Sequence, residues 1–148
     1  MPVGARDRQD ANPHAAPKDI ALAFIEGINA RSPEMLTALM TEDHQFIDSL
    51  GARISGREVM RTGWTGYFQM IPDYTVDVEE CLCSENVVVL LGAASGTYSR
   101  GGPLLPEDRW QTALAVRAEI RGGGVAKWQV YADNEPLRQV MGRPGGSI

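Results

Sequence analysis

The positions of apolar residues along the chain predict helices first and strands afterwards. Apolar residues recur at helical spacing over residues 20–29, which predicts an amphipathic helix. A second helix is expected to begin after Ser32, a residue that favours the helix N-cap, and to run through Met40. A third helix is predicted between Ser55 and Pro72. Helices therefore fill most of the first half of the chain.

The second half of the chain carries the pattern of strands. Residues 74–79 alternate between apolar and polar, and residues 87–91 form an unbroken apolar run that is typical of a central strand. Residues 110–120 and 125–132 alternate again, on either side of the glycine-rich turn 122–124. Helices followed by strands predict an α+β fold, in which a strongly curved, mostly antiparallel sheet wraps around three N-terminal helices and encloses a pocket.

An acidic residue ends the strand that precedes the third helix. Side chains alternate along a strand, so His44, Phe46 and Asp48 are predicted to share one face. If that face meets the core, desolvation disfavours the charged carboxylate and raises the pKa of Asp48 toward the range of a general base. Alternatively, Asp48 ends the strand and is held by the amides of its own turn or by Arg53. The sequence leaves both interpretations open, and it places His44 at the rim.

Length and charge restrict the class of protein. The 148 residues suit one domain, expected over residues 18–142 between a tail at 1–17 and a tail at 143–148. No apolar stretch is long enough for a membrane span or typical of a signal peptide, so a cytoplasmic protein is expected. A net charge of -5 without a basic cluster disfavours nucleic acid and anionic membranes as partners. No metal-ligand cluster or phosphate-binding loop is evident, so no cofactor is predicted.

The order of these elements and several short segments resemble the nuclear transport factor 2 superfamily, in its SnoaL-like and ketosteroid isomerase-like branch. The similarity extends from Ile20 to Met141. The segments that carry it are Ile28–Arg31, Phe46–Gly51, Ser55–Glu58, Phe68–Asp73 and Trp128–Asp133. The resemblance implies a cystatin-like cone of helices and sheet that encloses a hydrophobic pocket, and it implies a homodimer.

The resemblance also suggests roles for individual residues. Asp48 stands where ketosteroid isomerases have the Asp that transfers a proton between substrate carbons. Phe24 and Trp64 stand where those enzymes have tyrosines, and Val116 lies near the position of their neutral Asp. Asp133 is a counterpart of the acidic residue that SnoaL-like cyclases use as a base on the last strand. The proton acceptor is thus retained, whereas the donors to the substrate oxygen differ.

Aromatic residues complete the predicted site. Trp64, Tyr67, Trp110 and Trp128 are interpreted either as walls of a ligand pocket or as core packing between helices and sheet. Two functions follow. The first is a cofactor-free enzyme, of isomerase, polyketide cyclase or dehydratase type, that acts on a small hydrophobic carbonyl compound with Asp48 as general base. The second is a non-catalytic module of the same fold that binds a small molecule or serves dimerisation.

Overall fold

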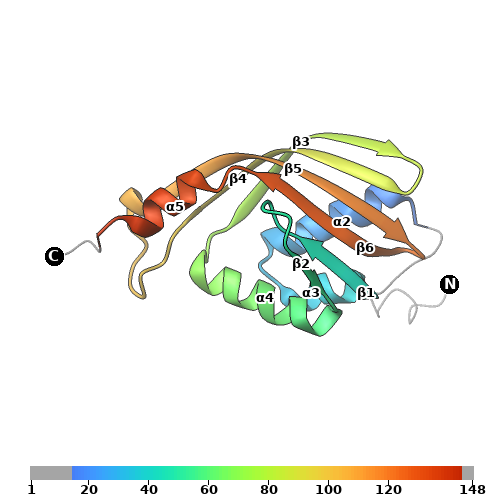
Figure 1. The fold of residues 1–148 in the computed structure, drawn as a ribbon, viewed down its shortest axis with the longest axis horizontal. Coiled ribbons are helices and arrows are strands. Elements are labelled where there is room, and N and C mark those ends of the chain that lie inside the picture. Colours follow the sequence, from blue (N-terminus) through green and yellow to red (C-terminus); the bar gives the residue numbers. More distant parts are fainter. Residues whose placement is uncertain (1–14, 145–148) are drawn as a thin grey trace.

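Helices cover one face of a curved sheet in the computed structural model, which describes residues 15–144 (Figure 1). The helices are α2 (Pro17–Asn29), α3 (Pro33–Leu39), α4 (Arg57–Met70) and α5 (Glu135–Gly142), with a short 3-10 helix η1 (Pro106–Asp108). The strands are β1 (Met40–Ile47), β2 (Arg53–Ser55), β3 (Thr75–Ser84), β4 (Val87–Thr97), β5 (Arg109–Arg121) and β6 (Gly124–Ala132). The predicted N-terminal tail falls almost entirely outside the described residues.

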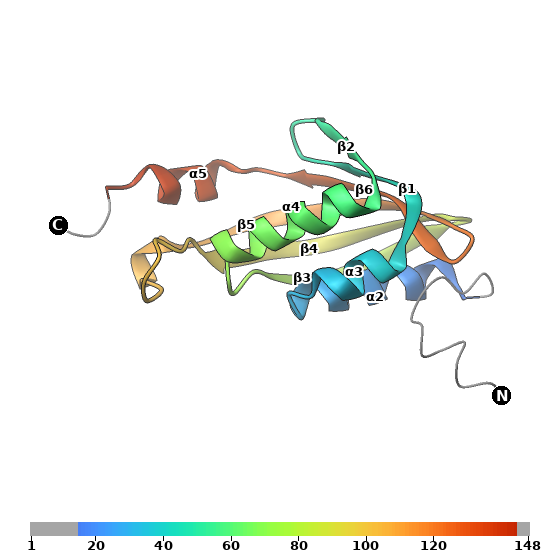
Figure 2. The same cartoon turned by 90° about the horizontal axis from the view of Figure 1, so that it is seen from below.

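The sheet has six strands in the order β2-β1-β6-β5-β4-β3. Neighbouring strands are antiparallel except β1 and β6, which pair in parallel. Figure 2 shows α2, α3 and α4 together on one face of this sheet. Their apolar sides bury residues such as Phe24, Leu36 and Trp64 against the inner side chains of the sheet. The predicted α+β class and the curved, mostly antiparallel sheet are therefore confirmed.

Three element boundaries differ from the sequence prediction. The second helix ends at Leu39, because Met40 already has an extended backbone and begins β1. The apolar run at residues 87–91 is only the first half of β4, which continues to Thr97 through small residues that periodicity does not mark. A regular helix, α5, follows β6 near the C-terminus, where the pattern of apolar residues predicted no helix.

Gly92 allows the neighbouring strands β3 and β4 to approach each other closely. A Cβ atom on Gly92 of β4 would lie 1.9 Å from the carbonyl oxygen of Asp77 on β3. The register of this strand pair shifts between Val78 and Glu80, which marks a β-bulge and adds local twist. Only a residue without a side chain fits there, so Gly92 is required for this part of the sheet to curve over α2.

Charged side chains fasten α5 to the end of the sheet. The Asp108 carboxylate is buried and accepts hydrogen bonds from Arg100 and from Arg143. The hydrogen bonds from Arg100, together with those from Arg143, hold the pKa of Asp108 below its usual range. Arg100 also donates to the backbone carbonyl of Val140 in α5. These contacts hold the C-terminal end of α5 against the end of the sheet.

Two further expectations concern a homodimer and the absence of a membrane-spanning helix. Tyr131 on β6 is 51% exposed, as its position in the alternating pattern predicts. The homodimer that the resemblance implies stays a prediction. Within residues 15–144, no helix combines the length and the apolar character needed to cross a membrane.

Candidate functional site

A cavity of about 290 Å³ lies between the helices α2 and α4 and the inner face of the sheet. This volume is at the lower end for sites that bind small organic molecules. Its walls are mostly aliphatic and aromatic. The lining residues are Ile25, Ile28, Phe46, Asp48, Ser49, Ile54, Met60, Gly63, Trp64, Tyr67, Tyr74, Val76, Ala94, Trp110, Thr112, Leu114, Val116, Trp128, Val130, Ala132 and Asn134.

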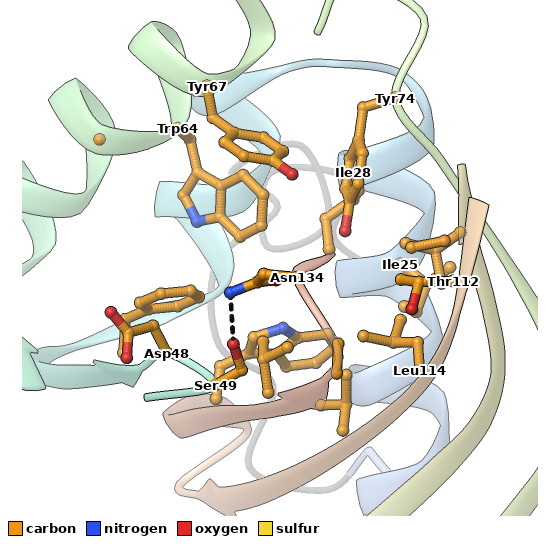
Figure 3. Close-up of a pocket in the computed structure, with 18 of the residues that line it drawn as sticks. Ile25, Ile28, Asp48, Ser49, Trp64, Tyr67, Tyr74, Thr112, Leu114 and Asn134 are labelled. Atoms are coloured by element: carbon orange, nitrogen blue, oxygen red, sulfur yellow. Dashed lines mark hydrogen bonds between the residues drawn. The ribbon is translucent and has the colours of Figure 1, made fainter. Parts of the chain in front are cut away.

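Asp48 lies at the edge of this cavity, directly after the end of β1. Its Oδ1 accepts hydrogen bonds from the backbone N–H groups of Leu50 and Ala52, both at 2.9 Å. Arg53 does not pair with it and donates instead to Gln45. Figure 3 shows the carboxylate at the margin of the cavity, turned away from its centre. One oxygen thus fixes the turn, while the other has no partner among the described residues. The role of Asp48 as a general base stays a prediction.

A hydrogen bond crosses the cavity beside Asp48. The side-chain amide of Asn134 donates to the hydroxyl of Ser49 at 2.7 Å, and Figure 3 shows this pair between the two sides of the site. Ser49 belongs to the turn after β1, whereas Asn134 joins β6 to α5. The bond therefore links the turn that carries Asp48 to the end of the last strand. Neither residue was predicted, because an isolated Ser or Asn in a loop gives no periodic pattern.

The indole N–H groups of Trp64 and Trp110 are buried, and they have no hydrogen-bond partner among residues 15–144. Both rings line the cavity. An unpaired buried donor costs about 1–3 kcal/mol. Neighbouring side chains cover both nitrogens, so the rings contribute chiefly apolar surface to the walls in this structure.

Two phenol groups supply the accessible donors. Figure 3 shows the hydroxyls of Tyr67 and Tyr74 on one wall, both directed into the cavity. Their rings meet edge to face with centroids 4.9 Å apart. Burial raises the pKa of Tyr67 to about 12, and burial together with the neighbouring Tyr67 raises the pKa of Tyr74. Both phenols are therefore neutral at physiological pH and able to donate.

Tyr74 was absent from the predicted site, although a usable pattern existed. It shares strand parity with Val76, and both side chains line the cavity at the start of β3. Extending the predicted alternation of residues 74–79 to the inner face would have placed Tyr74 there. The predicted residues Trp64, Tyr67, Trp110, Val116 and Trp128 also line the cavity. Their contact with a ligand stays a prediction.

Two predicted binding residues lie in the core instead of the cavity wall. Phe24 is fully buried, and the ring of Trp128 packs on it with centroids 4.4 Å apart, so Trp128 forms the wall and Phe24 lies behind it. His44 was expected at the rim but is also fully buried. Its ring centroid lies 6.1 Å from that of Phe24, and its Nδ1 lies 2.7 Å from the carbonyl oxygen of Val125, so His44 packs between α2 and β6.

Asp133 does not line the cavity either. Its side chain is exposed, and its Oδ1 accepts a hydrogen bond from the backbone N–H of Glu135 at 2.9 Å, in the first turn of α5. The backbone carbonyl of Asp133 accepts from the Thr112 hydroxyl. The residue that faces the cavity at this point is the next one, Asn134. Asp133 thus lies outside the cavity wall, because the chain turns away from strand geometry after Ala132, and its role as a catalytic acid stays a prediction.

The buried His44 makes stability depend on pH. Burial lowers the pKa of His44 from its usual 6.5, against an opposing effect of its hydrogen bond from Nδ1 to the carbonyl of Val125. Nearby Asp43 favours the charged form and Arg57 disfavours it. Below pH 6.5 the unfolded chain binds a proton that the folded chain resists, so acidification lowers the free energy of unfolding.

We expect His44→Asn to flatten this dependence, since the Asn amide can still donate to the Val125 carbonyl but does not titrate. The measurement is the free energy of unfolding in urea at about pH 7.5 and about pH 5, a window above the ordinary pKa of carboxylates. The wild type should lose more stability across the window than His44→Asn. Equal losses in the two proteins would show that another group causes the dependence.

Among residues 15–144, no three His, Cys, Asp or Glu side chains lie together in a way that could hold a metal ion. Within the cavity wall itself, the carboxylate of Asp48 and the oxygens of Ser49, Thr112 and Asn134 are the polar groups other than phenols and indoles.

Solved structures with the same fold include several small proteins with names related to polyketide and steroid chemistry. A protein of ketosteroid isomerase-like fold from Catenulispora acidiphila, in complex with trimethylamine, is 20% identical (TM-score 0.73, covering 88% of this chain and 97% of that one). IdmH, a putative polyketide cyclase from Streptomyces antibioticus, is 19% identical (TM-score 0.72, 87% and 100%). A putative SnoaL-like polyketide cyclase from Shewanella denitrificans is 10% identical (TM-score 0.74, 84% and 96%).

At these identities the likeness shows the shared fold. No curated protein matches the chain significantly. The sequence does match the profile of the SnoaL-like domain over residues 21–128, which span α2 to the middle of β6 and include most of the cavity wall. The chain belongs to the SnoaL-like domain family.

Proposed function

We propose that the cavity binds a small, mostly apolar carbonyl compound, and that Asp48 moves a proton on it without a cofactor. One observation carries this proposal. Among the residues that line the cavity, Asp48 is the only one with a carboxylate, and none of the others is a His, Lys or Arg. A single acid in an apolar and aromatic wall suits proton transfer to and from carbon, because a neutral ligand is bound beside one group that can accept a proton.

The turn around Asp48 leaves one oxygen for this chemistry. Oδ1 is held by the amides of Leu50 and Ala52, which fixes the orientation of the carboxylate, and Oδ2 has no partner among the described residues. In the proposed step, Oδ2 takes a proton from the carbon next to the ligand's carbonyl. The electron pair of the broken C–H bond forms the enolate, whose negative charge lies largely on the carbonyl oxygen.

The fate of the enolate defines the reaction. Return of the proton from Asp48 to a different carbon isomerises the compound. Attack of the enolate carbon on a second carbonyl of the same molecule forms a C–C bond and closes a ring, and the alkoxide formed from that carbonyl takes the proton back from Asp48. Expulsion of a neighbouring hydroxyl as water, with the proton that Asp48 holds, gives a dehydration. All three reactions require Asp48 to accept a proton and to return it. The names of the similar structures, putative polyketide cyclases among them, support this group of reactions.

The second candidate function is binding without catalysis. It is favoured by the position of the Asp48 carboxylate, which lies at the margin of the cavity with one oxygen already used by its own turn. In that case the cavity holds a small hydrophobic molecule and the carboxylate serves only the turn.

Deuterium exchange into 2-tetralone separates the two functions. This bicyclic ketone carries acidic C–H groups beside its carbonyl and needs no cofactor to exchange them. In D₂O, the wild-type protein is expected to accelerate deuterium incorporation, followed by NMR, above the rate with an equal concentration of acetate, which supplies a free carboxylate. If NMR shows that 2-tetralone binds while its exchange stays at the acetate rate, the binding module is the correct function.

A further inference from the structure

We propose that the hydroxyls of Tyr74 and Tyr67 form the subsite that recognises the oxygen of the ligand, with Tyr74 as its principal donor. The inference rests on the proposed function in one respect, namely that the ligand is a carbonyl compound. It assigns a role to Tyr74, which the predicted site did not include, and it leaves the covered indole groups of Trp64 and Trp110 without a part in binding that oxygen.

The hydrogen bonds around the cavity leave these two hydroxyls as the available donors. Asn134 donates to Ser49, and the Thr112 hydroxyl donates to the backbone of Asp133. The indole nitrogens of Trp64 and Trp110 are covered. By contrast, Figure 3 shows the Tyr67 and Tyr74 hydroxyls pointing into the cavity, with no hydrogen bond to the other residues drawn. A ligand oxygen that enters the cavity therefore meets these phenols first.

The backbone of Tyr74 is held from the side of α2. The amide side chain of Asn29 pairs with Val76 as a neighbouring strand would, accepting from its N–H at 2.8 Å and donating to its carbonyl at 3.0 Å. Arg31 donates to the carbonyl of Tyr74 itself at 3.0 Å. The N–H of Tyr74 donates to the carbonyl of Ile71. The start of β3 is thus fixed on both sides of the tyrosine.

The ring of Tyr74 is held by other aromatic rings. Tyr67 packs against it edge to face at 4.9 Å, and Trp110 lies 6.1 Å away on a tilted plane, both distances between centroids. A donor that is fixed before the ligand arrives loses little further freedom on binding, which makes its hydrogen bond more effective. The position of Tyr74 is therefore preorganised for an acceptor oxygen.

The subsite and Asp48 line the same cavity from different sides. Figure 3 shows Asp48 at one side of the cavity and Tyr74 at the other. A compound whose oxygen sits between the phenols would extend across the apolar wall toward the acid. Enolate formation places negative charge on the oxygen, and neutral phenol donors stabilise that charge more strongly than they stabilise the ground-state carbonyl.

The test compares two ligands that differ only in the oxygen, 2-acetylnaphthalene and 2-ethylnaphthalene, each titrated by NMR. Tyr74→Phe is expected to weaken binding of the ketone about 3- to 10-fold, the value of one hydrogen bond, and to leave the affinity for the hydrocarbon unchanged. Tyr67→Phe should act in the same direction with a smaller effect. Tyr131→Phe, on the outer face of β6, is the control and should change neither affinity.

Two results would overturn the proposal: equal weakening of both ligands by Tyr74→Phe, or no weakening of the ketone. The proposal would also be overturned if either ligand failed to bind the wild-type protein at its solubility limit. Tyr74→Phe should keep the wild-type melting temperature, because the hydroxyl bonds to none of the residues drawn with it in Figure 3. If the subsite exists without catalysis, the protein will prefer the ketone to the hydrocarbon in a way that depends on Tyr74. Deuterium incorporation into 2-tetralone will then be no faster than with acetate. The two proposals therefore fail in distinguishable ways.

Discussion

Replacing Asp48 by Asn is expected to slow the exchange of 2-tetralone by about 10²- to 10⁴-fold, the usual contribution of a positioned general base. The amide cannot accept a proton from carbon at neutral pH. Its carbonyl oxygen can still accept the two hydrogen bonds from Leu50 and Ala52, so the turn after β1 is retained. The free energy of unfolding, measured in urea, should change by less than about 1 kcal/mol.

Asp48→Ala is the matched control for the structural role of the carboxylate. This variant loses both turn hydrogen bonds as well as the base, so its stability should fall below that of Asp48→Asn while its exchange rate is equally low. Exchange that survives in Asp48→Asn would show that Asp48 is not the acceptor. The same variant should also keep the ketone selectivity that depends on Tyr74, since the subsite lies on the other side of the cavity.

Truncation of Trp128 to Ala is expected to lower the free energy of unfolding by about 3–5 kcal/mol, as for other large aromatic residues removed from a core. Trp128 is 1% exposed, packs directly on Phe24, and forms part of the cavity wall. Its removal takes away a large apolar surface and joins a new void to the existing cavity. Neighbouring helices and strands cannot close that void, because they are held by their own contacts.

Tyr131→Ala is the matched control, since Tyr131 lies on the same strand with opposite orientation and is 51% exposed. Its loss should change stability by no more than about 1 kcal/mol in the monomer. The measurement for both variants is urea unfolding followed by far-UV circular dichroism, so that the loss of a tryptophan does not alter the probe. Equal effects of the two substitutions would mean that the inner face of β6 does not carry the core.

Local patterns were sufficient for the parts of the site that lie on regular elements. The alternation of residues 110–120 and 125–132 placed Trp110, Val116 and Trp128 on the inner face, and these residues do line the cavity. Trp64, to which the resemblance pointed, and Tyr67, predicted as an aromatic residue of the site, also line the cavity from α4. In each case the side chain points in the direction that the period of the helix or strand predicts. The register irregularity between Val125 and Lys127 on β6 leaves Trp128 on the inner face.

The same reasoning failed where the backbone departs from its period. The end of β6 at Ala132 turned Asp133 outward while Asn134 came inward. His44 lies in the core, although Phe46 on the same face of β1 lines the cavity. Phe24 follows helical spacing correctly, yet Trp128 covers it. Periodicity predicts which side of a helix or strand faces the core. It does not predict which of the core-facing residues line the cavity.

The amino-acid sequence by itself determined the order of helices and strands, the α+β class, the curved antiparallel sheet and the family, because these depend on local periodicity and on short segments. Only the tertiary structure decided which polar groups face the cavity and which are already hydrogen-bonded. One oxygen of Asp48 accepts two hydrogen bonds, and the other has no partner among the described residues. The Asn134 amide donates to Ser49, whereas the Tyr74 hydroxyl points into the cavity. The physical reason is that a cavity is the space left between elements far apart in the chain. Its polar lining depends on hydrogen bonds such as Asn134 to Ser49, which join residues that no local pattern connects.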